Sequence, residues 1–247
     1  MPTSITSSSI TTTDLTVDSA DNLLKVDHAT NRVGIGTSSP AVPLDVTGTV
    51  QASGRYLTAS GSVTSGYQFS GDGHTGMFQP SVNTIGFSTS NAERMRIDAA
   101  GRVTKPYQPS FLYYSGGDVG FTAAQGSWAN LKVFGLNQHN IGNHYDTNND
   151  TFTCPVAGVY AFFVNVREET YYGSWGAIDI AIAINGTRQA VTKKWDGSQN
   201  EETLNIYITR NCAANDTVNV QVNSSSSDTN LAVEGSRTTW FGGHLLG

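Results

Sequence analysis

The sequence predicts an all-β protein in two parts, an elongated region of repeated short strands followed by a sandwich of longer alternating strands. Charged residues make up only 14% of the 247 positions, against roughly 25% in an average soluble domain. Glycine occupies 26 positions, and Ser, Thr and Asn supply most of the polarity. These residues favour turns and strands over helices, because they compete for their own backbone hydrogen bonds or add backbone entropy. In the second half, short apolar runs alternate with turn residues, which is typical of a β-sandwich.

The net charge of −6 excludes a cationic surface large enough to neutralise a run of phosphates. We therefore expect neither nucleic acid nor an anionic membrane surface as a partner. No apolar stretch approaches the roughly 20 residues of a membrane span, and residues 1–13 lack the basic and apolar parts of a signal peptide. The sequence thus predicts no membrane insertion and no Sec-dependent export. Its two cysteines, Cys154 and Cys212, are expected to be buried free thiols, with a single bridge between them as the alternative.

An imperfect internal repeat occupies the first part of the chain. Residues 31–50, NRVGIGTSSPAVPLDVTGTV, match residues 83–103, NTIGFSTSNAERMRIDAAGRV, with small shifts in register. Each copy offers only two or three apolar side chains per short strand, which is too little for a core of its own. Such strands need a partner surface, and three copies of the chain wound about one axis would supply it.

These repeats resemble a known family. The unit VGIGTSSP…LDVTG and the segment GDGHTGMFQPSVNTIGFSTSNAERMRIDAAGRV resemble the repeats in tail-fibre and tail-spike shafts of tailed bacteriophages. The resemblance implies an intertwined trimeric β shaft. The Ser/Thr-rich N-terminus is then either a disordered segment or the end that docks onto an upstream virion protein. Because the composition changes near Lys105, we expect a flexible or virion-attachment segment at residues 1–22, a trimeric β-repeat shaft at 23–105 and a head at 106–247.

The head has the pattern of at least nine strands separated by turn signals. Asn185-Gly186, for example, suits a two-residue hairpin, because both residues tolerate positive φ. The expected strands cover residues 111–114, 131–134, 143–145, 158–166, 177–184, 187–193, 203–209, 217–223 and 237–246. Their number and spacing predict a sandwich or jelly roll.

Two of these strands differ in how many of their faces are apolar. In residues 217–223, TVNVQVN, Val alternates with Asn and Gln, so one face is buried and the other is wet. In residues 158–166, GVYAFFVNV, one face carries Tyr160 and Phe162 while the other carries Phe163 and further apolar residues. A sandwich covers only one face of each sheet. The second apolar face therefore predicts a contact with another subunit.

The head carries a second resemblance. Phe134, residues 143–146 (NHYD) and residues 152–162 (FTCPVAGVYAF) are similar to the signature of the complement C1q globular domain, a member of the C1q/tumour-necrosis-factor superfamily. The resemblance implies a ten-stranded jelly roll that assembles as a trimer, with one sheet of each chain near the threefold axis. The closing WFGGH of this chain is bulkier at its start and less regular at its end than the family pattern. The residues expected to pack in the core or at the trimer contact are Phe152, Tyr160, Phe162, Phe163, Tyr207, Trp240 and Phe241.

Two motifs suggest ligand chemistry, but a structural role is favoured for each. Residues 71–76 match G-x-G-x-x-G, yet a proline follows too closely for the helix that a dinucleotide site requires, so we expect a turn in the shaft. Asp146, Asn148 and Asp150 have the spacing of a calcium loop. Thr and Ala stand where that loop needs Gly and a bidentate Glu, so we expect a connecting turn.

No arrangement of acids or histidines demands catalysis. His139 and His144 have a spacing that favours loop and strand packing over metal binding. The adjacent pairs Glu168-Glu169 and Glu201-Glu202 point to opposite faces of a strand, so catalytic partners could meet only across a trimer cleft, as in a polysaccharide depolymerase. We expect no enzyme, no cofactor and no metal.

Strand parity predicts where a ligand would bind. In the resembled fold both termini lie at one end, so the connections at 168–176, 194–202 and 224–236 fall at the far end and the turns at 185–187 and 210–216 lie beside the shaft. Large aromatic rings on exposed loops suit stacking on sugars or anchoring a protein; the alternative is that they cap the sandwich. The expected receptor-binding residues are Tyr171, Tyr172, Trp175, Trp195, Asp196 and Asn200.

The two resemblances together imply a bacteriophage tail fibre, a homotrimer in the virion that is assembled in the bacterial host cytoplasm. Its expected partners are two identical chains, an upstream virion tail protein at the N-terminus and a host surface receptor, a glycan or a protein. Several weak sites on one fibre would bind by avidity, without catalysis. Three alternatives remain: a structural virion fibre or collar without a receptor role, a secreted C1q-like lectin, and a polysaccharide depolymerase.

Overall fold

The computed structural model describes residues 14–17, 24–51, 66–69, 71–117, 119–122, 125–168, 177–194, 203–225, 230–234 and 237–247. Within these ranges every regular element is a strand, which confirms the all-β prediction. The described residues contain no helix long and apolar enough to cross a membrane. The chain divides into two compact units, residues 1–58 and 59–247.

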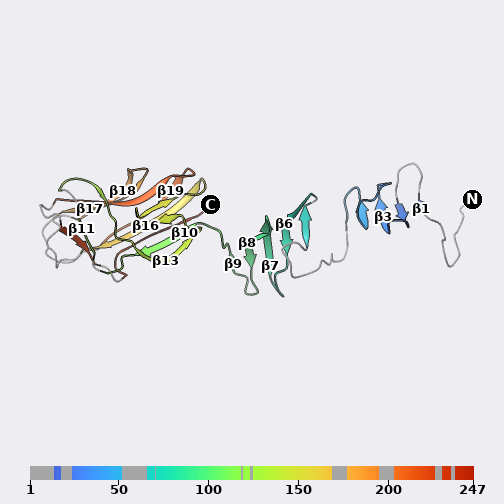
Figure 1. The fold of residues 1–247 in the computed structure, drawn as a ribbon, viewed down its shortest axis with the longest axis horizontal. Helices are drawn as coiled ribbons and strands as arrows, with labels where there is room; N and C mark the ends of the chain where they lie inside the picture. The colour runs from blue at the N-terminus through green and yellow to red at the C-terminus, as the bar shows by residue number, and fades with distance from the viewer. Residues whose placement is uncertain are drawn as a thin grey trace, which may run out of the picture. The chain divides into compact units, whose positions relative to one another are not determined.

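The first unit contains a four-stranded sheet (Figure 1, blue). Its strands, in spatial order, are β1 (Asp14–Val17), β2 (Leu24–Asp27), β3 (Arg32–Ile35) and β4 (Leu44–Val46). The first three pair antiparallel, whereas β3 and β4 pair in parallel, with Val33 opposite Leu44 and Ile35 opposite Val46. Asn31 has a φ of 54°, which gives the tight turn from β2 into β3.

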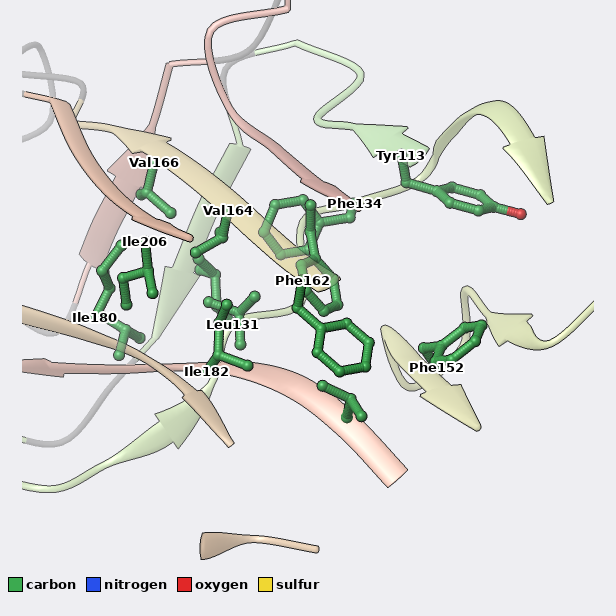
Figure 2. Packing of buried hydrophobic residues seen from close by; sticks show 14 of the residues in the cluster. Tyr113, Leu131, Phe134, Phe152, Phe162, Val164, Val166, Ile180, Ile182 and Ile206 are labelled. Atoms are coloured by element: carbon green, nitrogen blue, oxygen red, sulfur yellow. The ribbon is translucent and has the colours of Figure 1, made fainter. Parts of the chain in front are cut away.

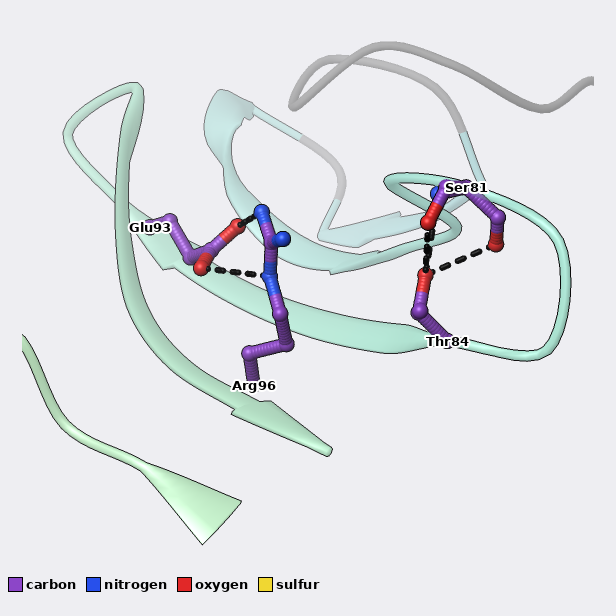
Figure 3. Close-up of polar contacts among 4 residues, drawn as sticks. All are labelled: Ser81, Thr84, Glu93 and Arg96. Atoms are coloured by element: carbon purple, nitrogen blue, oxygen red, sulfur yellow. Dashed lines mark hydrogen bonds and ion pairs between the residues drawn. The ribbon is translucent and has the colours of Figure 1, made fainter. Parts of the chain in front are cut away.

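The second unit begins with a five-stranded antiparallel sheet, here called the shaft sheet (Figure 1, teal to green). Its strands are β5 (Tyr67–Phe69), β6 (Asp72–Phe78), β7 (Ile85–Thr89), β8 (Ala92–Ile97) and β9 (Val103–Thr104). Ser90 and Asn91 join β7 to β8 with φ values of 52° and 59°, as a two-residue hairpin of type I′ requires. Figure 3 shows the turn before β7, where the Thr84 hydroxyl donates to the Ser81 carbonyl oxygen at 2.7 Å and accepts from the Ser81 N–H at 2.9 Å.

The two copies of the internal repeat share their turn and strands but not their pairing. Each copy begins with an Asn of positive φ, Asn31 or Asn83, and each continues into two short strands. In the first copy those strands are parallel, because residues 36–43, with two prolines, lead the chain back along the sheet. In the second copy a two-residue turn makes them antiparallel. The sequence repeat is thus not a repeat of hydrogen bonding.

The head is a sandwich of two antiparallel sheets, which confirms the jelly-roll prediction. Sheet I has the order β13 (Leu136–Ile141), β10 (Ser110–Tyr114), β22 (Trp240–Leu245), β16 (Gly158–Arg167) and β19 (Thr203–Cys212). Sheet II has the order β14 (Tyr145–Asp146), β15 (Thr151–Thr153), β20 (Thr217–Ser224), β17 (Ile178–Ile184) and β18 (Thr187–Lys194), with β12 (Ala129–Asn130) paired to β20. A separate pair joins β11 (Val119–Thr122) to β21 (Asn230–Val233).

The core fills the space between sheets I and II (Figure 2). From sheet I, β16 contributes Tyr160 and Phe162, and from sheet II, β17 contributes a run of isoleucines. The ring of Phe111 stacks on Phe152 with centroids 4.5 Å apart, and Tyr160 stacks on Phe162 at 5.8 Å. These aromatic contacts add to the large apolar area removed from water, which is the main stabilising contribution.

The expected strand at residues 131–134 is wrong. Leu131, Val133 and Phe134 are buried as expected, but their backbone is irregular. The Leu131 N–H donates to Val220 at 2.9 Å, and the Phe134 N–H donates to the buried Asp150 carboxylate at 2.9 Å. A side chain therefore satisfies the backbone where a neighbouring strand would otherwise be needed.

Five short head strands were not expected from the sequence. They are β11, β12, β13, β15 and β21. The strand β13, with the sequence LNQHNI, is largely polar and exposed because it lies at the edge of sheet I, so it lacks the apolar alternation that marks a buried strand.

Candidate functional site

Sheet I presents a second face that the sandwich does not cover. The strand β16 shows both faces: Tyr160, Phe162 and Val164 lie in the core, while Val159 is exposed and Phe163 half-buried on the opposite side. The sequence prediction of two apolar faces on this strand is therefore confirmed. The side chains on the outer face of sheet I include Leu112, Tyr114, Leu136, His139, Phe163, Tyr207, Trp240 and His244.

Phe163 lies at the centre of this outer face. It stands opposite Tyr207 of β19 on one side and Gly242 of β22 on the other. Its ring is 5.7 Å from that of Trp240 and 6.3 Å from that of His244, measured between centroids. Tyr207 is 67% exposed. The result is an aromatic surface on a strand face that no other described residues cover as a layer.

Packing explains the glycine in the irregular closing sequence of β22. A Cβ at Gly242 would overlap the Phe163 ring and lie 2.9 Å from the Phe111 carbonyl oxygen. Only glycine therefore lets the Phe163 ring lie across the backbone of β22. Of the residues expected at the core or the trimer contact, Phe152, Tyr160, Phe162 and Phe241 are buried in the core. The remaining three, Phe163, Tyr207 and Trp240, lie on the outer face.

His139 adds a titratable group to the outer face. It lies on β13 opposite Leu112 of β10. Two residues earlier on β10, Ser110 lies opposite His244 of β22. Burial lowers the pKa of His139 below its usual 6.5, and the charge of His244 lowers it further. The outer face thus disfavours a positive charge at His139.

The shaft sheet also has an uncovered apolar face, here called the apolar stripe. Tyr67, Met77, Phe87 and Met95 follow one another across four neighbouring strands. Phe69 is 70% exposed. A groove of about 400 Å³ runs beside Tyr67, Met77 and Phe87. Ile85, Ile97 and Val103 form a second row of the stripe.

The connections expected at the far end of the head do share one end, here called the loop end. Their flanking residues are bonded to one another: Glu234 N–H donates to Arg167 at 2.9 Å and Ser225 N–H donates to Ala177 at 2.8 Å. The expected receptor-binding residues Tyr171, Tyr172, Trp175, Trp195, Asp196 and Asn200 lie outside the described residues.

A buried ion pair ties the loop end together. The Lys194 ammonium donates to Glu168 Oε2 at 2.6 Å, and the two side chains are only 5% and 4% exposed. Nearby, the Arg167 guanidinium pairs with Glu234. From the sequence, Glu168 was predicted only as a candidate catalytic carboxylate, and no role was predicted for Lys194. The two lysines that end β18, Lys193 and Lys194, are the one sequence signal that could have indicated the pair.

The opposite end of the head, here called the base end, holds the short turns. Leu245 N–H donates to Pro109 at 3.0 Å, and Val159 N–H donates to Gly247 at 2.8 Å, so the start and finish of the head lie together. Asn185 N–H donates to Thr217 at 2.8 Å, which joins the β17–β18 turn to the turn before β20. The prediction of which connections share an end is confirmed.

The two sequence motifs serve structural roles. Residues 71–76 form a turn at Gly71 and then the strand β6, so the motif opens no helix and the expected turn covers only its first residue. Asp146 accepts hydrogen bonds from Asn148 and Asn149 within a turn. Asp150 is buried, away from solvent. The described residues contain no group of three or more His, Cys, Asp or Glu side chains that could hold a metal ion.

Comparison with known proteins identifies the head. A family model described as "C1q domain" matches residues 120–246, slightly more than half of the chain. Among solved structures, the globular domain of zebrafish complement 1qA is 14% identical, with 57% of this chain and 98% of that chain covered and a TM-score of 0.43. Eiger TNF from S. frugiperda is 10% identical, with 57% and 93% covered and a TM-score of 0.42. Murine APRIL at pH 8.5 is 10% identical, with 56% and 99% covered and a TM-score of 0.42. No curated protein sequence matches the chain.

Proposed function

The chain belongs to the C1q-domain family. We propose that it is a bacteriophage tail fibre whose trimeric head binds a receptor on the host surface. The observation that carries the proposal is that, among the residues the structure describes, two apolar surfaces stay uncovered, the outer face of sheet I and the apolar stripe. A fibre that assembles from several chains can bury both surfaces at its subunit contacts.

Assembly as a homotrimer is the first part of the proposal. Members of the C1q/TNF family are typically trimeric. The aromatic residues on the outer face of sheet I would lose their contact with water at a subunit contact, at about 25 cal/mol per Å² of apolar area. The apolar stripe supports the same stoichiometry for the shaft, because a single-layer sheet has no core of its own.

Receptor binding at the loop end is the second part. The base end is occupied by the start and finish of the head, which leaves the loop end free to face a partner. Aromatic and amide residues in the connections at 169–176 and 195–202 are suited to a glycan. Three such ends on one fibre would raise avidity without a strong individual contact.

The virion setting rests on the shaft repeats. Their resemblance to phage shafts favours a tail fibre over a secreted lectin, and the head favours a binding role over a purely structural collar. We propose that the fibre is assembled in the bacterial cytoplasm and joined to an upstream tail protein through residues 1–22. The proposal includes no catalysis, and the ion pair of Glu168 with Lys194 supports this by engaging one of the candidate carboxylates.

Sedimentation of the purified chain tests the assembly. We expect the wild type to sediment as a trimer, and Tyr207→Arg on the outer face of sheet I to dissociate it, because three guanidinium groups would be brought into an apolar contact. Val191→Arg is the matched control, since Val191 is also an exposed strand residue, at 53% against 67% for Tyr207, but lies on sheet II. A wild type that remains monomeric at micromolar concentration contradicts the proposal.

Adsorption to host cells tests the function. Antibodies against the head should label the tail fibres of whole particles, and the purified trimer should compete with particles for adsorption. Trp175→Ala with Trp195→Ala should abolish that competition while the protein remains trimeric. Labelling elsewhere on the particle would favour the structural alternative, and shortened glycan products after incubation with host polysaccharide would favour the depolymerase.

A further inference from the structure

The two cysteines, which the sequence separates by residues 155–211, lie together at the base end of the head. Cys154 directly follows β15, and Cys212 is the last residue of β19. The Cys154 N–H donates to the Asp216 carbonyl oxygen at 2.8 Å, and the Asn215 N–H donates to the Cys154 carbonyl oxygen at 2.7 Å. These two hydrogen bonds hold Cys154 against the turn that Cys212 begins.

Both thiols point into the head core. Cys154 is 0% and Cys212 2% exposed, and both belong to the same buried cluster as Tyr160. The Tyr160 hydroxyl donates to the Val156 carbonyl oxygen at 2.9 Å. No disulfide joins the two cysteines.

The two thiols are near enough to shift each other's pKa. Burial raises the pKa of the Cys154 thiol, and the neighbouring Cys212 raises it further. Burial also raises the pKa of Cys212, but a hydrogen bond from the Cys154 thiol works in the opposite direction. The neighbouring cysteine raises the pKa of Cys154 but lowers that of Cys212, so Cys212 is the sulfur that more readily carries the thiolate.

We propose that Cys154 and Cys212 are a latent disulfide, which a small hydroperoxide closes within one folded chain to clamp the base end of the head. The Cys212 thiolate attacks one peroxide oxygen, the O–O bond breaks, and a sulfenic acid forms while hydroxide leaves and takes up a proton. The Cys154 sulfur then attacks the Cys212 sulfur, the S–O bond breaks, and water leaves as the Cys154 proton is transferred. Two thiols and one hydrogen peroxide thus become one disulfide and two waters.

Burial determines how the clamp behaves. It excludes bulky disulfides and other chains, so the product is an intrachain bond and the oxidant must be small. It also keeps the thiolate scarce, so closure is slow at neutral pH and faster in alkali. Once formed, the bond joins the β15–β16 connection to the end of β19 and restricts the unfolded chain between them.

Intact mass after peroxide treatment tests the proposal. The full chain is reduced, freed of reductant and incubated with hydrogen peroxide at neutral and alkaline pH. We expect a loss of about 2 Da, one peptide pair linking Cys154 to Cys212, faster closure at the higher pH, and a melting temperature raised by several degrees that reductant reverses.

Two single variants serve as matched controls. In Cys154→Ser the remaining Cys212 should gain about 16 Da as a sulfenic acid or about 32 Da as a sulfinic acid, because no second thiol is there to close the bond. In Cys212→Ser the more deeply shifted Cys154 should stay unmodified over the same time. Should either variant unfold, the wild-type peptide map alone decides the question. An unchanged wild-type mass, a gain of oxygen at either cysteine of the wild type, a covalent dimer, or closure only in guanidinium would each overturn the proposal.

Discussion

The head and the shaft sheet are built from the same kind of strand but differ in whether their apolar side chains are buried. In the head, Phe162 of β16 and Ile180 of β17 lie in the core between the two sheets and are fully buried. In the shaft sheet, Phe87 and Tyr67 are exposed, and Phe78 is the one aromatic or branched aliphatic side chain buried among the described residues 24–107. An alternating pattern makes a core only where a second layer is present to receive it. The head contains its own second layer, whereas the described residues provide none for the shaft sheet.

The largest expected effect is the loss of a core ring in the head. Phe162→Ala should lower the free energy of unfolding by about 4 kcal/mol, because the surrounding rings cannot fill the cavity. Urea unfolding of the head, followed by tryptophan fluorescence, measures it. Val159→Ala on the opposite face of β16 is the control and should cost less than about 1 kcal/mol. Equal losses for the two variants would remove the distinction between the faces.

The ion pair at the loop end should give the next largest effect. Lys194→Met leaves the Glu168 carboxylate buried without its cation, which should cost about 3 kcal/mol of stability. The double variant Glu168→Leu with Lys194→Met should recover most of the loss, because two apolar side chains need no partner. Thermal unfolding of the three proteins separates these outcomes. A double variant no more stable than Lys194→Met would show that the pair acts through other contacts.

A variant in the apolar stripe tests whether the shaft sheet is covered by a partner. Phe87→Ser should weaken the assembled protein by about 2 kcal/mol per chain, the value of burying one phenyl ring. In a dissociated chain it should change little, because Phe87 is already exposed. Val82→Ser, an exposed residue of the turn before β7, is the control. Concentration-dependent melting measures both, and a loss independent of concentration would argue against a partner on the stripe.

The smallest expected effect concerns pH at the outer face of sheet I. The folded head lowers the pKa of His139 below 6.5, so the unfolded chain binds its proton more readily. The stabilising contribution is therefore complete above pH 6.5 and is lost as the pH falls through that value toward the folded-state pKa. His139→Gln should flatten this part of the stability profile, measured by urea unfolding between pH 8 and about pH 5.

Much of the head was predictable because its signals are local. Alternation in residues 217–223 predicted β20 and its buried valines, and Asn185-Gly186 predicted the β17–β18 hairpin. The two faces of β16 followed from counting apolar residues at alternate positions. The family resemblance at residues 152–162 implied the jelly roll, which no local pattern contains.

What the sequence did not reveal depends on contacts between distant residues. The backbone of Phe134 is satisfied by Asp150, a side chain outside the expected strand, so alternation at residues 131–134 misled the prediction. The ion pair of Glu168 with Lys194 joins two strand ends that only the folded sandwich brings together. The need for glycine at position 242 comes from the Phe163 ring, which occupies the space a Cβ would fill.

The two directions of strand pairing in the repeat bear on how such chains diversify. A parallel pair such as β3 and β4 leaves the chain running the way it entered, whereas the β7–β8 hairpin reverses it. Exchange of these two segments by recombination would therefore reverse the direction of the chain that follows, although their sequences are similar. The direction in which the chain continues is therefore set by the residues between the two strands, Gly36 to Pro43 in the first copy, and not by the repeated strands themselves.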